Sequence, residues 1–260
     1  MDFKDFNKIV IKVGSSTLTY DNGRPNLRRI EQLCRVVSDL KNRGTDVILV
    51  SSGAIAVGVN RLRLPARPKD TKGKQAAAAV GQCDLMSIYD RSFAEYGYVS
   101  AQILLNRDVI DHEDRKTNVI NTFNTLLEYG AIPIVNENDS VSVEEILFGD
   151  NDNLSAIVAA LVEAQGLIIL TDIDGYYDDN PRENPDARLI HEVTEITDEM
   201  IENAGGNGTN RGTGGMRTKL EAAKYAAAHN IQTIIMSGDD PKKIFDVFDG
   251  YSIGTIFKGK

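Results

Sequence analysis

Two segments of the chain combine lysine with glycine and hydroxyl side chains, a composition that suits the binding of phosphate groups. Lys12 stands near the end of an apolar run and is followed by the small-residue turn Gly14 to Thr17 (GSST). Lys219 ends the segment Gly212 to Lys219 (GTGGMRTK), which leads directly into a helical pattern. Exposed backbone N–H groups at a helix start, with a hydroxyl and an ammonium group, suit nucleotide phosphates. The second segment is the strongest local signal, whereas the first alone is more typical of a surface strand that ends in a turn.

Two other segments carry dense clusters of carboxylate and carboxamide side chains. They are Asn136 to Ser140 (NENDS) and Gly149 to Asn153 (GDNDN). Like charges repel when they lose water, so such clusters favour the binding of a cation or an ammonium group, as an amino-acid substrate carries. A solvated acidic loop that caps a helix explains either cluster equally well. A calcium loop is excluded, because the glycine at its sixth position and the glutamate at its twelfth are missing.

The segment Ser51 to Ala56 (SSGAIA) is a further candidate for ligand binding. Ser52 can cap the helix that follows, and Gly53 allows a ligand to approach the backbone. An anion would fit there, although an ordinary helix cap accounts for the same residues. Other classes of site lack their motifs: the chain contains no complete Walker P-loop, no Rossmann fingerprint and no Gly-x-Ser-x-Gly elbow. The isolated His112, His191 and His229 are more typical of surface residues than of catalytic ones.

Apolar runs alternate with helical patterns along the chain, and this alternation predicts how these segments are positioned. Continuous apolar strands indicate a mostly parallel sheet covered by helices on both faces, an α/β three-layer αβα sandwich. Ligands then bind at the carboxyl ends of the strands, so the loops after Val13, Val50, Val135 and Leu170 should line the site. Two long stretches, 61–74 and 172–215, are candidate lids or specificity loops. The predicted strands are 8–13, 46–50, 98–105, 131–135, 166–170 and 232–236, and the main predicted helices are 27–40, 75–96, 118–129, 154–162 and 218–229.

The composition excludes several broad classes of protein. The 260 residues are 42% hydrophobic and 26% charged, enough for one sizeable core, and we expect a single domain over 1–260. With 29 basic and 38 acidic residues, the net charge of −9 disfavours general binding to nucleic acid or to an anionic membrane. Only two cysteines occur, Cys34 and Cys83, and both are predicted to pack. We find no secretory signal and no membrane-spanning run, so a cytoplasmic location is expected.

The order of the motifs is more informative than any one of them. The series KVGSS, SSGAIAVG, IPIVNENDSV, FGDNDNLSA, LTDIDGYYDDNP and GTGGMRTKLEAA closely resembles the amino acid kinase family over about Lys8 to Lys258. Within that family it resembles the branch that phosphorylates the γ-carboxylate of free glutamate with ATP, the first step of proline biosynthesis. The resemblance implies the amino acid kinase fold. Many members of that branch continue into a C-terminal PUA-type domain, which we do not expect in these 260 residues.

The resemblance also implies roles for individual residues. Lys12 and Lys219 would stabilise the transferring phosphoryl group, and Asp152 would hold the two lysines. Positions resembling the family's glutamate site are Ser52, Gly53, Ala54, Asp139 and Asn151. Positions resembling its ATP site are Lys12, Gly14, Thr171, Asp172, Thr213, Gly214, Gly215, Met216, Arg217, Thr218 and Lys219.

The same resemblance implies cofactors and partners. ATP would be the co-substrate, with Mg²⁺ held mainly by phosphate oxygens and water and no dedicated metal ligands on the protein. A glutamyl-phosphate reductase would act on the product, proline would be a feedback inhibitor, and the chain would form a homo-oligomer. Two alternatives stay open from the sequence: a sister kinase acting on acetylglutamate, aspartate, carbamate or a nucleoside monophosphate, and a non-catalytic protein that binds glutamate or nucleotide.

Overall fold

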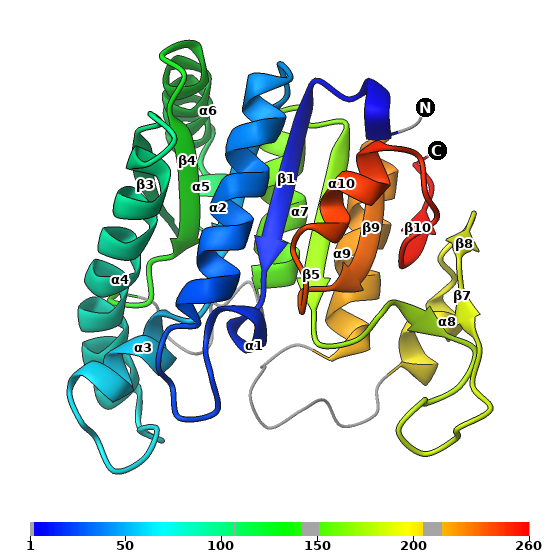
Figure 1. Ribbon diagram of the computed structural model, residues 1–260, viewed down its shortest axis with the longest axis horizontal. Helices are drawn as coiled ribbons and strands as arrows, with labels where there is room; N and C mark the ends of the chain where they lie inside the picture. The colour runs from blue at the N-terminus through cyan, green and yellow to red at the C-terminus, as the bar shows by residue number, and fades with distance from the viewer. Residues whose placement is uncertain (1–2, 107, 142–150, 205–214, 260) are drawn as a thin grey trace.

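Helices and strands alternate through the computed structural model, which describes residues 3–106, 108–141, 151–204 and 215–259 (Figure 1). The strands are β1 (Lys8–Val13), β2 (Asp46–Ser51), β3 (Ser100–Leu105), β4 (Ile132–Glu137), β5 (Gly166–Thr171), β6 (Tyr176–Tyr177), β7 (Leu189–Ile190), β8 (Glu192–Val193), β9 (Gln232–Ser237) and β10 (Thr255–Phe257). The helices are α1 (Ser15–Leu18), α2 (Leu27–Asn42), α3 (Ala54–Arg61), α4 (Thr71–Ala94), α5 (Asp108–Asp111), α6 (Glu113–Glu128), α7 (Asn151–Leu161), α8 (Asp198–Asn203), α9 (Met216–Ala228) and α10 (Lys243–Phe248), with a short 3-10 turn at Phe3–Asp5.

In the described part of the chain, eight strands form one sheet in the order β3-β4-β2-β1-β5-β9-β10-β8. The six strands from β3 to β9 run parallel, and β1 lies between β2 and β5 with Lys12 opposite Val50 and Ile169. β10 pairs antiparallel with β9 and parallel with β8, so this edge runs the other way. The predicted mostly parallel sheet is confirmed. Its parallel strands end at one edge, where their arrowheads lie in Figure 1.

Both faces of the sheet are buried, which explains why the strands are continuously apolar rather than alternating. One face packs against α2, α4 and α10 and the other against α6, α7 and α9 (Figure 1). Neighbouring residues of β1 show the division: Ile9 and Ile11 belong to the first core, and Val10 belongs to the second. The three-layer αβα sandwich is therefore confirmed.

Helices α3 and α4 pack unusually closely, and this contact places the start of α3. A Cβ atom added to Gly81 would lie 1.8 Å from the Ala54 carbonyl oxygen, and one added to Gly58 would lie 1.8 Å from the Ala77 carbonyl oxygen. Glycine is thus the only residue that allows the two backbones to meet at these points. Gly53, which precedes α3, has a φ of +97° and so adopts a left-handed conformation that favours glycine.

The two long stretches that the sequence leaves unassigned contain regular structure. Helix α4 begins at Thr71, four residues earlier than expected, because the Asp70 carboxylate accepts a hydrogen bond from the Gly73 N–H at 3.0 Å and caps the helix. The stretch after β5 contains the β6–β7 hairpin, the edge strand β8 and helix α8. These strands have two residues each, too few to produce a hydrophobic period, and β10 with three residues is missed for the same reason.

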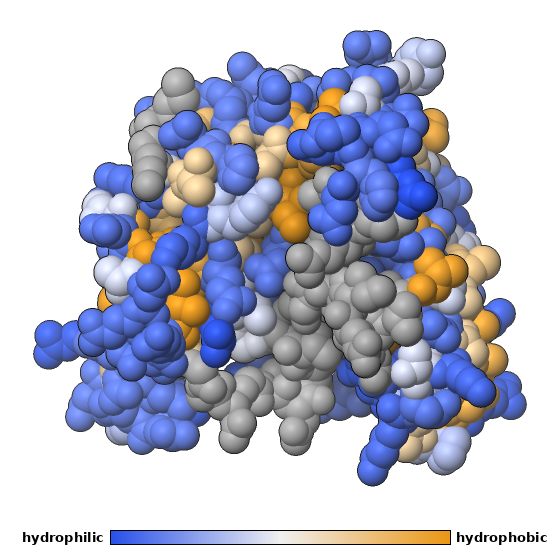
Figure 2. Space-filling model, turned by 180° about the vertical axis from the view of Figure 1, so that it is seen from behind, coloured by the Kyte–Doolittle hydropathy of each residue, from blue (hydrophilic) through white to orange (hydrophobic). Residues whose placement is uncertain are grey.

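The surface seen from behind is mostly hydrophilic, with apolar side chains in separate small groups (Figure 2). Among the residues that the structure describes, none of the helices is both long enough and apolar enough to span a membrane.

Candidate active site

The loops at the carboxyl ends of the parallel strands are joined by backbone hydrogen bonds. Gly14 donates its N–H to the Leu170 carbonyl at 3.2 Å, Ser52 donates to the Val13 carbonyl at 3.1 Å, and Gly238 donates to the Thr171 carbonyl at 2.7 Å. These bonds connect the ends of β1, β2, β5 and β9 into one rim. The Gly14 N–H is used within the fold, so a phosphate cradle after Lys12 cannot include it.

Asp152 lies at the centre of this rim, between two lysine side chains. Its Oδ1 atom is 2.6 Å from Lys12 Nζ and its Oδ2 atom is 3.0 Å from Lys219 Nζ. The Thr218 hydroxyl donates to the same Oδ2 atom at 3.0 Å. Asp152 is completely buried, and Lys12 and Lys219 are only 4% and 5% exposed. The structure therefore brings together the three residues predicted to be catalytic.

The geometry of this cluster favours an additional anion. Two buried ammonium groups share one carboxylate, so the three side chains carry a net positive charge in a place where water cannot screen it. Two like charges stay close only when an anion lies between them, which is the position of Asp152. Asp152 stands in the first turn of α7, where the helix dipole also favours its negative charge. The arrangement suits a polyanion such as a nucleotide phosphate.

Thr171 and Asp172 form a second polar group at the end of β5. Burial alone would raise the pKa of Asp172, but its own backbone N–H, the Thr171 hydroxyl, Arg182 and Lys219 together hold that pKa below its ordinary value. The Thr171 hydroxyl donates to Asp172 at 3.2 Å, and Arg182 donates to the other carboxylate oxygen at 3.1 Å. Asp172 is therefore an anion at neutral pH and contributes to the field around Lys219.

A chain of side-chain amides crosses the other half of the rim. Asn151 donates from Nδ2 to Ser52 Oγ at 2.9 Å and to Asn136 Oδ1 at 3.0 Å. Asn136 in turn donates from Nδ2 to Gln82 Oε1 at 3.0 Å, and Gln82 donates from Nε2 to Gln102 Oε1 at 3.2 Å. Each amide fixes the orientation of the next, so the donor and acceptor atoms of Asn151 and Ser52 are set from α4 and β3.

The amide chain borders a pocket of about 430 Å³ between α3, α4 and the end of β4. Asp139 lies in its wall, half-buried, and burial raises the pKa of its carboxyl above the ordinary value while the nearby Arg67 partly offsets this. Cys83 also lines the pocket and is exposed, so the prediction that it packs is wrong, whereas Cys34 is buried as predicted. The pocket is lined by Ala54, Ala78, Ala79, Gln82, Cys83, Met86, Gln102, Leu104, Glu137, Asn138, Asp139 and Ser140.

Several predicted residues have different surroundings from those the sequence indicates. Gly53, and not Ser52, is the N-cap of α3, because the Ser52 side chain is engaged by Asn151. Gly215 caps α9, and Met216 begins that helix. Arg217 is exposed and pairs with Glu221 at 3.0 Å. Two of the predicted ATP-site residues, Thr213 and Gly214, lie outside the described residues.

Three residues of the rim receive no role in the sequence analysis. Asn136 belongs to the recognised NENDS cluster, but only Asp139 of that cluster receives a role. Gln82 lies within an Ala-rich helical run that shows no motif, and Arg182 lies in a polar stretch without periodicity. A single polar residue among the alanines of this helix does not indicate which side chain it contacts, so the sequence does not predict the hydrogen bond between Gln82 and Asn136.

The fold and this site together define a class of protein. The amino acid kinase family matches the chain over residues 7–237, nearly the whole described structure. Solved structures agree at the level of the fold: the isopentenyl phosphate kinase of T. acidophilum, determined as a product complex, has a TM-score of 0.64 at 18% identity and covers 96% of this chain and 100% of its own. The UMP kinase of Bacillus anthracis has a TM-score of 0.65 at 12% identity, with 98% and 97% covered.

Curated relatives specify the branch of the family. The glutamate 5-kinase of Clostridium perfringens is 58% identical over 99% of this chain and 97% of its own length. The glutamate 5-kinases of Listeria monocytogenes and Enterococcus faecalis are 54% and 50% identical, over 99% and 96% of this chain and 95% and 94% of their own lengths. The chain therefore belongs to the amino acid kinase family and, within it, to the glutamate 5-kinases.

Replacement of Asp152 by Asn should reduce the stability of the protein. The variant leaves two buried ammonium groups without their shared counter-charge, and the loss of one partner of a buried ion pair costs about 3–5 kcal/mol. Urea unfolding measures this change. Asp198→Asn is the matched control, because Asp198 pairs with Lys224 on the surface beside the same helix α9 and should contribute little. Equal stability losses in the two variants would contradict a special role for the buried cluster.

Proposed function

We propose that this protein transfers the γ-phosphoryl group of ATP to the γ-carboxylate of L-glutamate, giving ADP and L-glutamyl 5-phosphate. The single observation that carries the proposal is the buried cluster in which Asp152 holds Lys12 and Lys219 at the carboxyl edge of the sheet. The pocket beside it has an acidic residue, Asp139, suited to an ammonium group. The similarity to glutamate 5-kinases, at 50% to 58% identity for the three relatives above, supports the choice of substrate.

The chemistry needs charge stabilisation more than proton transfer. A carboxylate with a reference pKa of about 4.3 is already ionised at neutral pH, so the nucleophile needs no general base. The three histidines are all exposed, in agreement with a reaction that does not use them. An anion must instead approach the polyanionic γ-phosphate in line, and the negative charge of the transition state spreads over the equatorial oxygens. Fixed cations and N–H dipoles are the groups that lower such a barrier.

Lys12 and Lys219 meet this requirement from two directions. Lys12 comes from the central strand β1 and would face the transferring phosphoryl on the acceptor side, whereas Lys219 comes from α9 and would face the nucleotide side. Asp152 is a positioning residue in this mechanism, because it holds both ammonium groups and contacts neither substrate. Its two carboxylate oxygens bond one lysine each, so the lysines keep a fixed separation before ATP arrives.

Glutamate would bind along the amide chain and the adjoining pocket. Ser52 and Asn151, with the backbone N–H groups of Gly53 and Ala54, would hold a carboxylate. Asp139 would bind the α-ammonium group from the pocket wall. Arg67, the cation whose charge acts on Asp139, belongs to the connection between α3 and α4.

ATP would occupy the half of the rim around β5 and α9. Thr171, Asp172 and the segment from Thr213 to Lys219 are the proposed contacts, with Gly14 close to the transferring group. Within the described residues, the structure contains no group of three acidic, histidine or cysteine side chains that could hold a metal ion. Mg²⁺ would be bound chiefly by phosphate oxygens and water, where it would neutralise phosphate charge. Asp172, whose pKa is held below its ordinary value, would contact the water molecules around the ion.

The wider setting follows from the same proposal. The reaction would be the first step of proline biosynthesis in the cytoplasm, with proline as a feedback inhibitor and the product consumed by a glutamyl-phosphate reductase. The kinase domain would occupy residues 1–260 and assemble as a homo-oligomer. These features rest on the branch of the family rather than on a contact in the described residues.

A panel of acceptors tests the proposed substrate directly. ADP release is measured with Mg²⁺ and ATP in the presence of L-glutamate, L-aspartate, N-acetyl-L-glutamate, carbamate or UMP, with hydroxylamine added to trap an acyl phosphate as its hydroxamate. Turnover and hydroxamate are expected with L-glutamate, because the pocket offers a carboxylate to a free ammonium group. Preference for another acceptor would show a sister kinase, and no turnover with any acceptor would show a binding protein without catalysis.

Two variants should separate the phosphoryl and glutamate sites kinetically. Lys219→Ala should lower kcat by about a hundred-fold or more while changing the KM for glutamate little, because Lys219 acts on the developing phosphoryl charge. Asp139→Ala should mainly raise the KM for glutamate, because it removes the partner of the ammonium group. Steady-state kinetics with each substrate varied in turn measures both. A kcat of Lys219→Ala within a factor of two of wild type would rule out its proposed role.

The amide chain yields a graded prediction for glutamate binding. Gln82→Leu removes the acceptor that orients Asn136, so the KM for glutamate should rise by about five-fold or more with kcat nearly unchanged. Gln102→Leu removes only the outermost link and should change the KM by less than about two-fold, which makes it the matched control. Equal effects of the two variants, or a fall in kcat alone, would mean that the chain does not position the glutamate site.

A further inference from the structure

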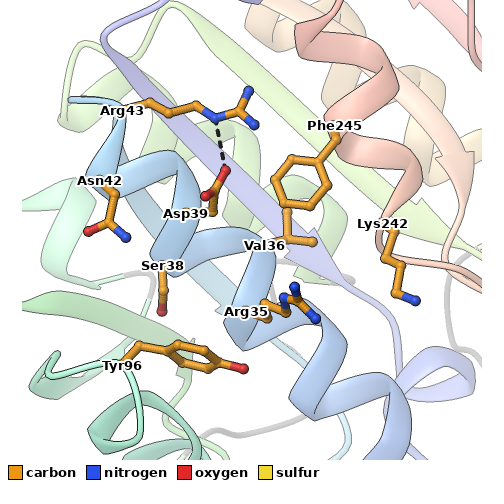
Figure 3. A pocket seen from close by; sticks show the side chains of 9 residues that line it. All are labelled: Arg35, Val36, Ser38, Asp39, Asn42, Arg43, Tyr96, Lys242 and Phe245. Carbon is orange, nitrogen blue, oxygen red and sulfur yellow. Dashed lines mark ion pairs between the residues drawn. The ribbon is translucent and has the colours of Figure 1, made fainter.

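A second pocket lies between α2, the end of α4 and α10, and shares no lining residue with the active site (Figure 3). Its volume of about 420 Å³ falls in the range of small-molecule sites. Asp46 begins β2 shortly after α2 ends, so the C-terminal half of α2 that lines the pocket lies toward the opposite edge of the sheet from the rim. The lining residues are Arg35, Val36, Ser38, Asp39, Asn42, Arg43, Tyr96, Lys242 and Phe245.

One wall of this pocket combines aromatic rings with a charged side chain that is held by internal contacts. The Arg43 guanidinium lies 5.2 Å from the centre of the Phe245 ring, and its Nε atom is 2.8 Å from Asp39. Arg43 also lies 3.8 Å from the Asp249 carboxylate, so its positive charge is compensated by two acidic side chains. Phe245 and Tyr96 also line the pocket, and their rings suit contact with an apolar or aromatic group, whereas Val36 is completely buried.

The other two charged side chains that line the pocket, Arg35 and Lys242, are both cations. Arg35 and Lys242 form no ion pair with any residue in the described ranges. Arg35 lies on α2 and Lys242 directly precedes α10, and Figure 3 shows both side chains on the same side of the pocket. In a chain with a net charge of −9, two exposed cations without an acidic partner at one cavity are a specific feature.

A buried hydroxyl adds an independent observation. Ser38 lines the pocket and is only 1% exposed, yet its Oγ atom has no hydrogen-bond partner among the described residues. A buried polar group without a partner is costly, and a ligand oxygen would remove that cost. Ser38 lies one turn from Arg35 on α2, so a single ligand could contact both.

We propose that this pocket binds a small organic anion that joins a carboxylate or phosphate group to an apolar, preferably aromatic, body. Arg35 and Lys242 bind the oxyanion, Ser38 donates a hydrogen bond to the ligand, and the apolar body packs against Tyr96 and Phe245. The site is separate from the proposed catalytic reaction, and its test does not depend on turnover.

Calorimetric titration with phenyl phosphate, benzoate and inorganic phosphate tests the proposal on the full chain. Phenyl phosphate or benzoate should bind more tightly than inorganic phosphate, because only they fill the apolar wall. The double variant Arg35→Gln/Lys242→Gln should weaken that binding by about ten-fold or more, since two charge-assisted hydrogen bonds are lost. Ser38→Ala should weaken it by about three-fold.

The control is Arg28→Gln/Lys243→Gln, which removes the same charge from the surfaces of the same two helices outside the pocket. This control should bind the organic anions as the wild type does, and circular dichroism checks that all variants fold. Equal binding by the two double variants would overturn the proposal. The anion would then bind at the proposed ATP site or at no defined site. If inorganic phosphate bound as tightly as phenyl phosphate, the proposal that the ligand carries an apolar group would be wrong.

Discussion

The placement of a single carboxylate between two lysines is the constraint on which the rest of the structure depends. Asp152, Lys12 and Lys219 belong to α7, β1 and α9, and they are separated by more than sixty residues at each step of the sequence. Only a fold that brings the end of a central strand and the starts of two helices to one edge can assemble them. The parallel sheet does so, because β1 and β5 end together and α7 and α9 pack side by side on one face. The buried charges are costly alone, so the cluster exists only when the fold is complete.

The two halves of the rim are built on different physical principles. Around Lys219, ionised groups dominate, and Asp172 stays charged because hydrogen bonds and cations outweigh its partial burial. Around Ser52, neutral amides dominate, and the side chains of Asn151, Asn136 and Gln82 form a directional chain. A strong field suits a phosphate whose charge moves during reaction, whereas fixed donors and acceptors suit recognition of a substrate shape. The division agrees with the proposed places of ATP and glutamate.

The sequence predicts the parallel core because burial on both faces produces continuous apolar strands, and it finds Lys12, Asp152 and Lys219 through motifs that resemble a family. It does not predict features that depend on a particular partner. The capping of α4 by Asp70, the close approach at Gly81 and the link from Gln82 to Asn136 all require knowing which residues meet. Ser52 is an instructive error, since a serine before a helix usually caps it, but here Asn151 engages the hydroxyl and Gly53 takes the cap position.

Net charge and site charge act over different distances in this protein. The overall charge of −9 disfavours general binding to polyanions, yet the proposed reaction requires a site for ATP. Exposed charges are screened over about 8 Å at physiological ionic strength, so distant surface carboxylates contribute little to the rim. Lys12 and Lys219 are almost completely buried, where the lower dielectric strengthens their attraction for a phosphate group. An acidic surface is therefore compatible with a strongly cationic centre, and composition alone does not reveal that centre.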